Sequence, residues 1–301
     1  MRDLVKALKT VFLLLFILMS ASHADASPNR IVSLSPVGTE ILYMLGQERN
    51  IAAVTNFCDY PPEAKQKPKV GGFTDVSMEN LIAMNADLIV LQDLHKKLAL
   101  NLEKLGVPYV TIRQESVEDI YDSIVAVGKA CGAEEQAERL SSEIKSQIND
   151  VAAKAASLPK RRVLLCVSRE LSEPRISVFY AAGGKTFYDE LITLAGGENV
   201  LKDFEAAYPR VSAEGLVALD PEAIIDLVGD SAYYHSPGNI DKETVFSEER
   251  LMGQWKSGPQ VEAVRDGRVS ILRGTVYLRP GPRITEILRV FAEAIHPEEQ
   301  W

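Results

Sequence analysis

Two acidic segments repeat along the sequence at a constant offset of 135 residues. Residues 76–83 read VSMENLIA and residues 211–218 read VSAEGLVA, so five of the eight positions coincide. A serine two positions before each glutamate is a typical helix N-cap, which places Glu79 and Glu214 in first helical turns. One interpretation is compensation of the helix dipole, worth about 0.3–1 kcal/mol each. The repeat favours another, in which two acidic side chains bind basic sites on a two-fold symmetric partner.

Motifs for catalysis or metal binding are weak in this sequence. Residues 183–186 (GGKT) resemble the end of a phosphate-binding loop, but the full motif needs glycine where Phe179 stands. No G-x-S-x-G or H-E-x-x-H motif occurs. A metal site would need several of His95, His235 and His296 together with a carboxylate. We predict no catalytic residue, no metal and no cofactor, with haem ligation by a histidine or tyrosine as an alternative.

The composition is that of an acidic globular protein. The 301 residues are 46% hydrophobic and 25% charged, with a formal net charge of −9. This excludes a wholly disordered chain, and the lack of a basic block disfavours nucleic acid as a partner. Cys58, Cys131 and Cys166 leave two alternatives open, which are one disulfide with a free thiol, or three buried thiols.

The first 26 residues have the pattern of a secretory signal peptide. A basic stretch over 1–9 precedes an unbroken apolar run over 11–19, and residues 24–26 (ADA) fit cleavage before Ser27, with cleavage after Ala24 as the alternative. The apolar run is far shorter than the ~20 residues that a transmembrane anchor needs. No cysteine lies near the cleavage site, so we predict an exported, soluble protein without a lipid anchor.

Strands alternate with helices on both sides of one long helical segment. Before it, the expected strands are 30–34, 51–55, 87–91 and 107–112, and the expected helices are 39–45, 76–85, 96–105 and 118–131. Residues 133–158 contain no Gly or Pro and predict a helix of roughly 39 Å. After it, the expected strands are 162–167, 223–227 and 268–272, and the expected helices are 184–195, 212–219 and 282–295.

This pattern predicts an α/β protein with two Rossmann-like lobes joined by one long helix. The predicted units are a signal peptide (1–26), an N-terminal lobe (27–132), a connecting helix (133–158) and a C-terminal lobe (159–301). Ligands bind outside the carboxyl ends of the strands in such sheets, so we expect a ligand cleft between the lobes. One rigid connecting helix would allow only small-amplitude closure.

Six stretches between residues 31 and 283 carry a family resemblance that covers residues 29–295. They are IVSLSP at 31–36 with Thr39-Glu40, DYPP at 59–62, the Glu79 segment with ADLI at 86–89, AGGENV at 195–200, YPRVSAE at 208–214 and RPGPR at 279–283. With this set the sequence resembles the single-helix-linked substrate-binding proteins of bacterial ABC importers, which bind vitamin B12, ferric siderophores or haem. It is most similar to the vitamin B12-binding branch.

The resemblance implies a role for several residues. Glu79 and Glu214 would dock on arginines of a permease dimer, which works with its ATPase subunits. The ligand would contact Pro36, Val37, Gly38, Phe57, Phe73 and Gln92 from the N-terminal lobe, and Tyr208, Tyr277 and Arg279 from the C-terminal lobe. A corrinoid is a large disc with apolar faces, and aromatic side chains suit it because they bury a wide area at low entropy cost.

The sequence departs from the vitamin B12-binding pattern at several positions. Phe57, Phe73 and Gln92 stand where those proteins tend to carry a tyrosine and two tryptophans, so aromatic character is kept at two positions and lost at one. Thr275 replaces an acidic residue. These departures leave the predicted fold unchanged, but they leave the identity of the ligand open.

Other ligands and other functions remain open alternatives. Arg279 and Arg283 are suited to the carboxylates of haem or of a siderophore, although Arg283 also has a structural interpretation. Tyr180, Tyr233 and Tyr234 are further candidates in loops near the expected cleft. The leading hypothesis is a monomeric periplasmic protein that delivers a corrinoid to an ABC importer. The alternatives are the same role for a ferric siderophore or haem, a secreted α/β enzyme, and a ligand sensor.

Overall fold

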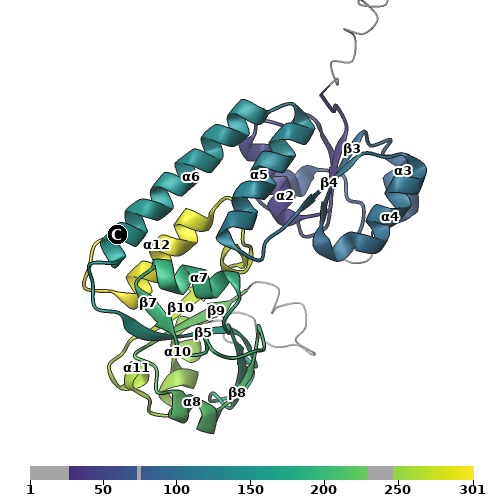
Figure 1. Cartoon of the computed structure of the whole chain (residues 1–301). Coiled ribbons are helices and arrows are strands. Elements are labelled where there is room, and N and C mark those ends of the chain that lie inside the picture. Colours follow the sequence, from purple (N-terminus) through teal and green to yellow (C-terminus); the bar gives the residue numbers. More distant parts are fainter. Residues whose placement is uncertain (1–26, 73–75, 230–246) are drawn as a thin grey trace, which may run out of the picture.

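The computed structural model describes residues 27–72, 76–229 and 247–301, which form two α/β lobes joined by a long helix (Figure 1). The predicted signal peptide lies outside the described residues, as do Phe73, Tyr233, Tyr234 and His235. The predicted fold class is therefore confirmed.

The N-terminal lobe is built on a parallel sheet of order β2-β1-β3-β4. Its strands are β1 (Ile31–Ser33), β2 (Ile51–Val54), β3 (Leu88–Gln92) and β4 (Tyr109–Ile112), and its helices are α2 (Pro36–Met44), α3 (Met78–Ala83), α4 (Lys96–Leu105) and α5 (Val117–Cys131), with short 3₁₀ turns η1 (Pro62–Gln66) and η2 (Asp93–His95). Leu88 and Val90 of β3 pack with α2 and α5, whereas Ile89 and Leu91 pack with α3 and α4. Because both faces of the sheet are covered, β3 is apolar along its length.

The C-terminal lobe has a mixed sheet of order β10-β9-β5-β6-β8, with β7 paired to β5. Its strands are β5 (Arg161–Arg169), β6 (Val178–Ala181), β7 (Gly197–Asn199), β8 (Arg210–Ser212), β9 (Ala223–Val228) and β10 (Val269–Arg273). Its helices are α7 (Phe187–Leu194), α8 (Ala213–Leu219), α10 (Glu248–Lys256), α11 (Glu262–Arg265) and α12 (Ile284–Ile295), with the 3₁₀ turn η4 (Thr275–Leu278). The pairs β10–β9 and β9–β5 are parallel, while β6 is antiparallel to both neighbours.

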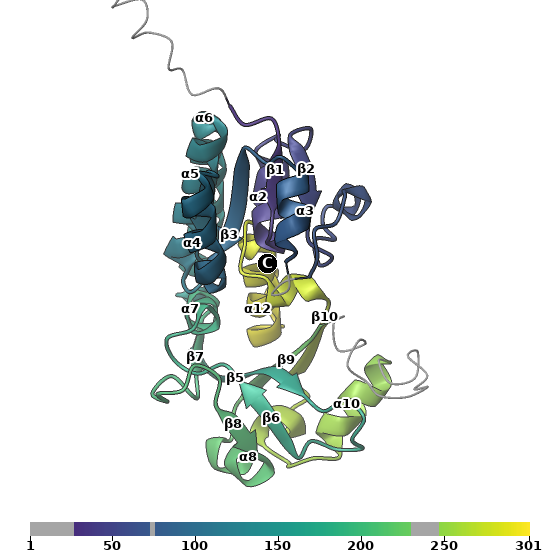
Figure 2. The same ribbon diagram turned by 90° about the vertical axis from the view of Figure 1, so that its right-hand side faces the viewer.

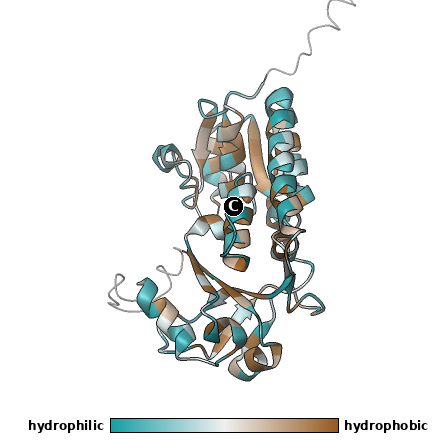
Figure 3. Cartoon of the chain, turned by 90° about the vertical axis from the view of Figure 1, so that its left-hand side faces the viewer, coloured by the Kyte–Doolittle hydropathy of each residue, from teal (hydrophilic) through white to brown (hydrophobic). Residues whose placement is uncertain are grey.

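One helix, α6 (Glu134–Ala155), spans both lobes. Its 22 residues make it about 33 Å long. A stripe at spacings of three and four residues is buried, namely Ala137, Ser141, Ile144, Ile148, Val151 and Ala155. This stripe packs on α5 of one lobe and on α7 and α12 of the other, while hydrophilic residues cover the rest of α6 (Figures 2 and 3). One apolar core therefore continues from lobe to lobe beneath α6.

The three cysteines are free thiols, and each is buried. This agrees with the second of the two cysteine alternatives. Burial raises the pKa of all three thiols, that of Cys131 to about 12. In the part of the chain that the structure describes, no helix is both long and apolar enough to cross a membrane.

Candidate functional site

The segment 277–283 of the C-terminal lobe lies against the N-terminal lobe, and we call this contact the inter-lobe seam. The segment follows β10, and its partners in the N-terminal lobe include residues that follow β1 and β2. In open α/β sheets these carboxyl ends of strands are where ligands bind. Most of the predicted ligand residues that the structure describes lie at or beside this seam.

Arg279 crosses the seam and pairs with a carboxylate of the other lobe. Its guanidinium forms an ion pair with Asp59 and donates a hydrogen bond to the carbonyl oxygen of Phe57 at 3.2 Å. The Arg279 side chain is 14% exposed. A predicted ligand-binding arginine is therefore already engaged by an acid of the N-terminal lobe.

Arg283 also crosses the seam, in a bidentate pair. Its Nε and Nη2 donate to the two carboxylate oxygens of Glu40, each at 2.8 Å, and its guanidinium lies 3.8 Å from the centre of the Tyr60 ring. Glu40 belongs to α2 and is only 2% exposed. Two parallel hydrogen bonds to a buried carboxylate favour the structural interpretation of Arg283.

Gln92 takes part in a chain of hydrogen bonds that ends on the same segment. Its side-chain amide donates to Ser35 Oγ at 2.8 Å and to Gln114 Oε1 at 2.6 Å. Gln114 in turn donates to the carbonyl oxygen of Pro280 at 2.7 Å. Gln92 is 8% exposed, so its side chain links the two lobes and offers little surface to a ligand.

The predicted loop Pro36-Val37-Gly38 forms the buried first turn of α2. The hydroxyl of Ser35 caps it by accepting a hydrogen bond from the Gly38 N–H at 3.2 Å. A Cβ on Gly281 would lie 3.0 Å from a methyl group of Val37, so the seam segment packs tightly on this turn. These residues therefore underlie the seam.

Aromatic side chains supply the exposed apolar surface around the seam. Phe57 and Tyr208 are 46% and 49% exposed, and Tyr60 is also exposed. Tyr180, which was expected in a loop, is instead exposed on strand β6. Tyr277 is half-buried, and its carbonyl oxygen accepts a hydrogen bond from the Tyr188 hydroxyl at 2.9 Å. Burial raises the pKa of Tyr188, and the nearby Tyr208 raises it further, so these tyrosines form one group with Tyr277.

The backbone around Gly183 and Gly184 explains the sequence that resembles a phosphate loop. A Cβ on Gly184 would lie 1.9 Å from the carbonyl oxygen of Lys202, and one on Gly183 would lie 2.4 Å from that of Ala206. The Gly183 N–H also donates to the carbonyl oxygen of Ala207 at 2.8 Å. The glycines allow the loop that carries Tyr208 to approach closely, which is a structural role.

The two predicted acidic helices, α3 and α8, have matching geometry. Ser77 and Ser212 each cap their helix by accepting a backbone hydrogen bond at 3.2 Å. Glu79 and Glu214 are both exposed. A hydrogen bond from its own backbone N–H and one from the Ser212 hydroxyl lower the pKa of Glu214, so this carboxylate is ionised.

Metal ligation finds no support in the part of the chain that is described. Within 27–72, 76–229 and 247–301, no three His, Cys, Asp or Glu side chains are placed to hold an ion. His95 accepts a hydrogen bond from the Gln92 N–H at 3.1 Å in η2. His296 is buried just after α12.

Sequence reasoning missed the acids that pair with the seam arginines. Glu40 and Asp59 stand in two of the motifs that carry the resemblance, but nothing in one sequence assigns them to Arg283 and Arg279, more than 200 positions away. Gln114 was missed for the same reason. For Glu40 and Asp59 the motif positions were the only available signal, and Gln114 stands in none of these motifs.

Comparisons with known proteins agree with this architecture. A family model described as periplasmic binding protein matches residues 31–276. An uncharacterized ABC transporter substrate-binding lipoprotein, YvrC of Bacillus subtilis, is 29% identical over 287 residues, covering 92% of this chain and 84% of the relative. The vitamin B12-binding protein of Vibrio parahaemolyticus is 28% identical over 267 residues, covering 88% of each.

A solved structure also matches along nearly the whole chain. It is that of a possible iron-binding periplasmic solute-binding protein from Staphylococcus epidermidis, with a TM-score of 0.71 and 27% identity. The match covers 90% of this chain and 100% of that one. The similar proteins thus agree on fold and differ in the ligand named.

Proposed function

The chain belongs to the periplasmic binding protein family, and from this premise we propose that it captures a corrinoid and delivers it to an ABC importer. Proteins of this family bind a substrate and do not convert it, so the chain is not an enzyme. In this proposal residues 1–26 direct export, the mature protein acts in the periplasm without a lipid anchor, and its partners are a permease dimer and the ATPase subunits.

The observation that carries the delivery role is the matched pair of exposed glutamates. Glu79 and Glu214 stand at equivalent positions of α3 and α8, one on each lobe. One glutamate in the first turn of a helix would be explained by compensation of the helix dipole. Two glutamates at equivalent positions of the two lobes suit a partner that is itself two-fold symmetric. The permease dimer is such a partner, and its arginines would bind the two carboxylates.

Two features of the seam support a corrinoid as the ligand. Phe57 and Tyr208 offer half-exposed aromatic surface, which suits a large disc with apolar faces. The arginines that a carboxylate ligand would need, Arg279 and Arg283, already pair with Asp59 and Glu40. Haem or a carboxylate siderophore would have to displace a protein carboxylate, whereas the amides of a corrinoid would not. The similarity to a vitamin B12-binding protein points the same way.

An iron chelate remains the second candidate. The solved structure at 27% identity is that of a possible iron-binding protein, and that likeness favours a ferric siderophore or haem in the same site. In that case Arg279 would exchange Asp59 for a ligand carboxylate. The transport role is the same for both candidates.

Uptake of radiolabelled cyanocobalamin by cells that lack this chain tests the proposal. The wild-type chain should restore uptake, and the double variant Glu79→Ala, Glu214→Ala should restore none while binding cyanocobalamin normally. The double variant Glu138→Ala, Glu143→Ala is the charge-matched control, because both side chains are exposed on α6. Full uptake with the Glu79, Glu214 variant would refute the docking role.

A further inference from the structure

The surfaces of α3 and α8 match beyond their glutamates. Three positions after each glutamate stands an exposed β-branched residue, Ile82 at 62% exposure and Val217 at 58%. Between them, Leu81 and Leu216 are buried in their own lobes. Residues three apart on a helix are neighbours, so each helix presents a carboxylate beside an apolar side chain.

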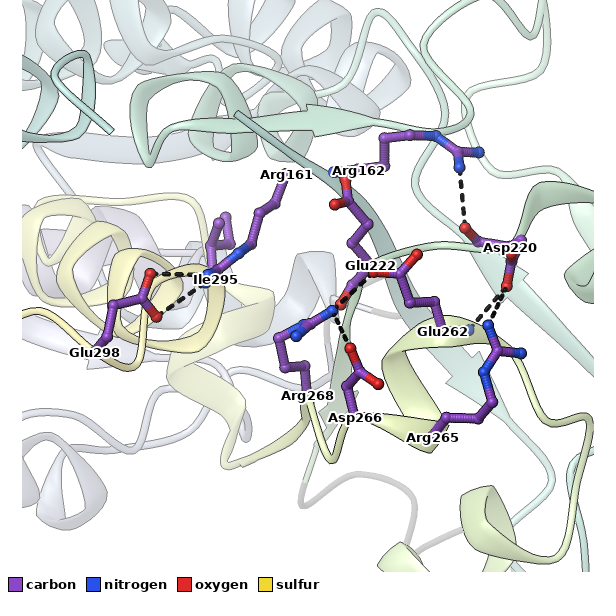
Figure 4. A network of polar contacts seen from close by, with 10 residues as sticks. All are labelled: Arg161, Arg162, Asp220, Glu222, Glu262, Arg265, Asp266, Arg268, Ile295 and Glu298. Atoms are coloured by element: carbon purple, nitrogen blue, oxygen red, sulfur yellow. Dashed lines mark hydrogen bonds and ion pairs between the residues drawn. The ribbon is translucent and has the colours of Figure 1, made fainter. Parts of the chain in front are cut away.

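Both helices are also held by an arginine in the same way. Arg30 donates from Nε and Nη2 to the carbonyl oxygen of Met84, at 2.9 and 2.7 Å, just after α3. Arg162 donates to the carbonyl oxygen of Leu219, the last residue of α8, and to that of Asp220 at 3.0 Å. Figure 4 shows the contact with Asp220. We call this contact between an arginine and a helix end the arginine clasp.

An acidic residue that follows each helix fixes the backbone of the clasp arginine. This residue is Asp87 for Arg30 and Glu222 for Arg162. The Arg30 N–H donates to Asp87 Oδ1 at 3.0 Å, and the Arg162 N–H donates to Glu222 Oε2 at 2.8 Å. Asp87 and Glu222 return the contact, since their N–H groups donate to the carbonyl oxygens of the same arginines at 3.0 and 2.8 Å.

The helix ends match in backbone conformation as well. Asn85 and Asp220 both adopt positive φ, 45° and 36°, at equivalent positions of the repeat. With 6 and 7 residues, α3 and α8 are too short to be stable alone. The clasp and this turn therefore fix how each helix, with its glutamate and its β-branched residue, is oriented on its lobe.

We propose that Ile82 and Val217 are the apolar half of the permease-docking surface, and that Arg30 and Arg162 are the positioning residues that hold it. The inference rests on the proposed function, because the two-fold symmetric permease dimer is the occupant to which it commits. Each half of that dimer would offer a cation to the glutamate and an apolar side chain beside it.

Two observations point to a two-fold symmetric permease dimer, namely the negative charge of the surface and its repetition on both lobes. Two acids at equivalent positions call for two equivalent cations, and the matched Ile82 and Val217 call for two equivalent apolar contacts. Figure 1 shows α3 and α8 at the outer ends of the two lobes, so one broad partner would have to span both. Ile82 also borders an apolar hollow of about 320 Å³ that reaches Leu105 of α4, and this hollow offers space for an apolar side chain of the permease.

Site-specific photocrosslinking in living cells is the first test. A p-benzoyl-phenylalanine placed at position 82, and in a separate variant at position 217, should capture the same permease polypeptide, identified by mass spectrometry. The matched control is position 125 on α5, where Val125 is exposed at 44%, and it should capture none. Capture of unrelated proteins, or of the permease from one position only, would overturn the proposal.

Affinity for that permease dimer in lipid nanodiscs is the second test. The double variant Ile82→Thr, Val217→Thr keeps a β-branched side chain at both positions but makes it polar, and should weaken binding on the order of tenfold, with Val125→Thr unchanged. Salt screens the glutamate contribution but leaves the apolar one, so the loss should persist at high ionic strength. Arg30→Gln should weaken docking as well while ligand affinity stays unchanged.

The outcomes separate this inference from the proposed function. If Glu79→Ala, Glu214→Ala abolishes docking while Ile82→Thr, Val217→Thr binds like the wild type, the apolar surface is refuted and the transport role stands. If the glutamate variant docks normally, the docking role of Glu79 and Glu214 has failed. If the wild-type chain neither docks on the permease nor restores uptake, the proposed function itself has failed.

Discussion

At the residue scale, the partner of each seam arginine decides its role. Arg279 and Arg283 lie four positions apart, and each reaches into the other lobe to meet a carboxylate. The two acids differ, because Asp59 is partly exposed while Glu40 is almost completely buried. In the proposed site a ligand would therefore compete with the more exposed Asp59 for Arg279, whereas the buried Glu40 keeps Arg283 as a fixed part of the seam.

Glu40→Ala is expected to destabilise the protein by about 3–5 kcal/mol, because it leaves the Arg283 guanidinium without its partner in a largely buried site. Urea unfolding measures this loss. Glu135→Ala is the matched control, since it removes an exposed i,i+4 pair with Arg139 and should cost less than about 1 kcal/mol. Equal losses in the two variants would contradict the structural role of the Arg283 pair.

At the element scale, strong apolar patterns were predictable and short edge elements were not. The strand over 87–91 and the helix over 96–105 appear as β3 and α4 within one residue, because each is a clear apolar run or an amphipathic stretch. The short strands β6, β7 and β8 were missed, since three or four residues carry little pattern and depend on pairing with distant chain. Helices α10 and α11 were also missed.

Part of the candidate site was likewise predictable from the sequence, and part was not. The glutamates of α3 and α8 were predictable because a local repeat of serine, glutamate and leucine marks them. The seam was not, because its contacts join residues such as Gln114 and Pro280 that are 166 positions apart. Only folding brings such residues together.

The end of α12 predicts a dependence of stability on pH. Burial, and next the nearby Arg161, lower the pKa of His296 in the folded state below its unfolded value. Below about pH 6.5 the unfolded chain therefore binds a proton that the folded chain does not. The free energy of unfolding then decreases as the pH is lowered, by up to about 1.4 kcal/mol per pH unit. Urea unfolding at about pH 7.5 and about pH 5.5 measures this slope. The slope should be smaller in His296→Gln, and an unchanged slope would exclude His296 as its source.

At the scale of the whole molecule, the contacts between the lobes limit their relative motion. Besides α6 and the seam, Glu190 of α7 accepts a hydrogen bond from the Val117 N–H at the start of α5, at 2.7 Å. The apolar core beneath α6 is continuous between the lobes. A permease would thus meet α3 and α8 at a nearly constant separation, whether or not ligand is bound.

Small-angle X-ray scattering should accordingly show little closure. We expect the radius of gyration to change by less than about 1 Å when cyanocobalamin is added, as for other preorganised binding proteins. A change of several ångströms would show that the lobes move relative to each other on binding and would contradict a nearly rigid seam.

The most direct test of the account is a thermal-shift panel on the chain from Ser27 onward with cyanocobalamin, cobinamide, haem and ferric siderophores. A ligand at about 100 times its Kd adds ~2.7 kcal/mol of stability. For a chain of this size that raises Tm on the order of 5–10 °C. The account predicts this shift with both corrinoids, and a smaller one in Tyr208→Ala. A shift with haem or a siderophore alone, and none with either corrinoid, would contradict it.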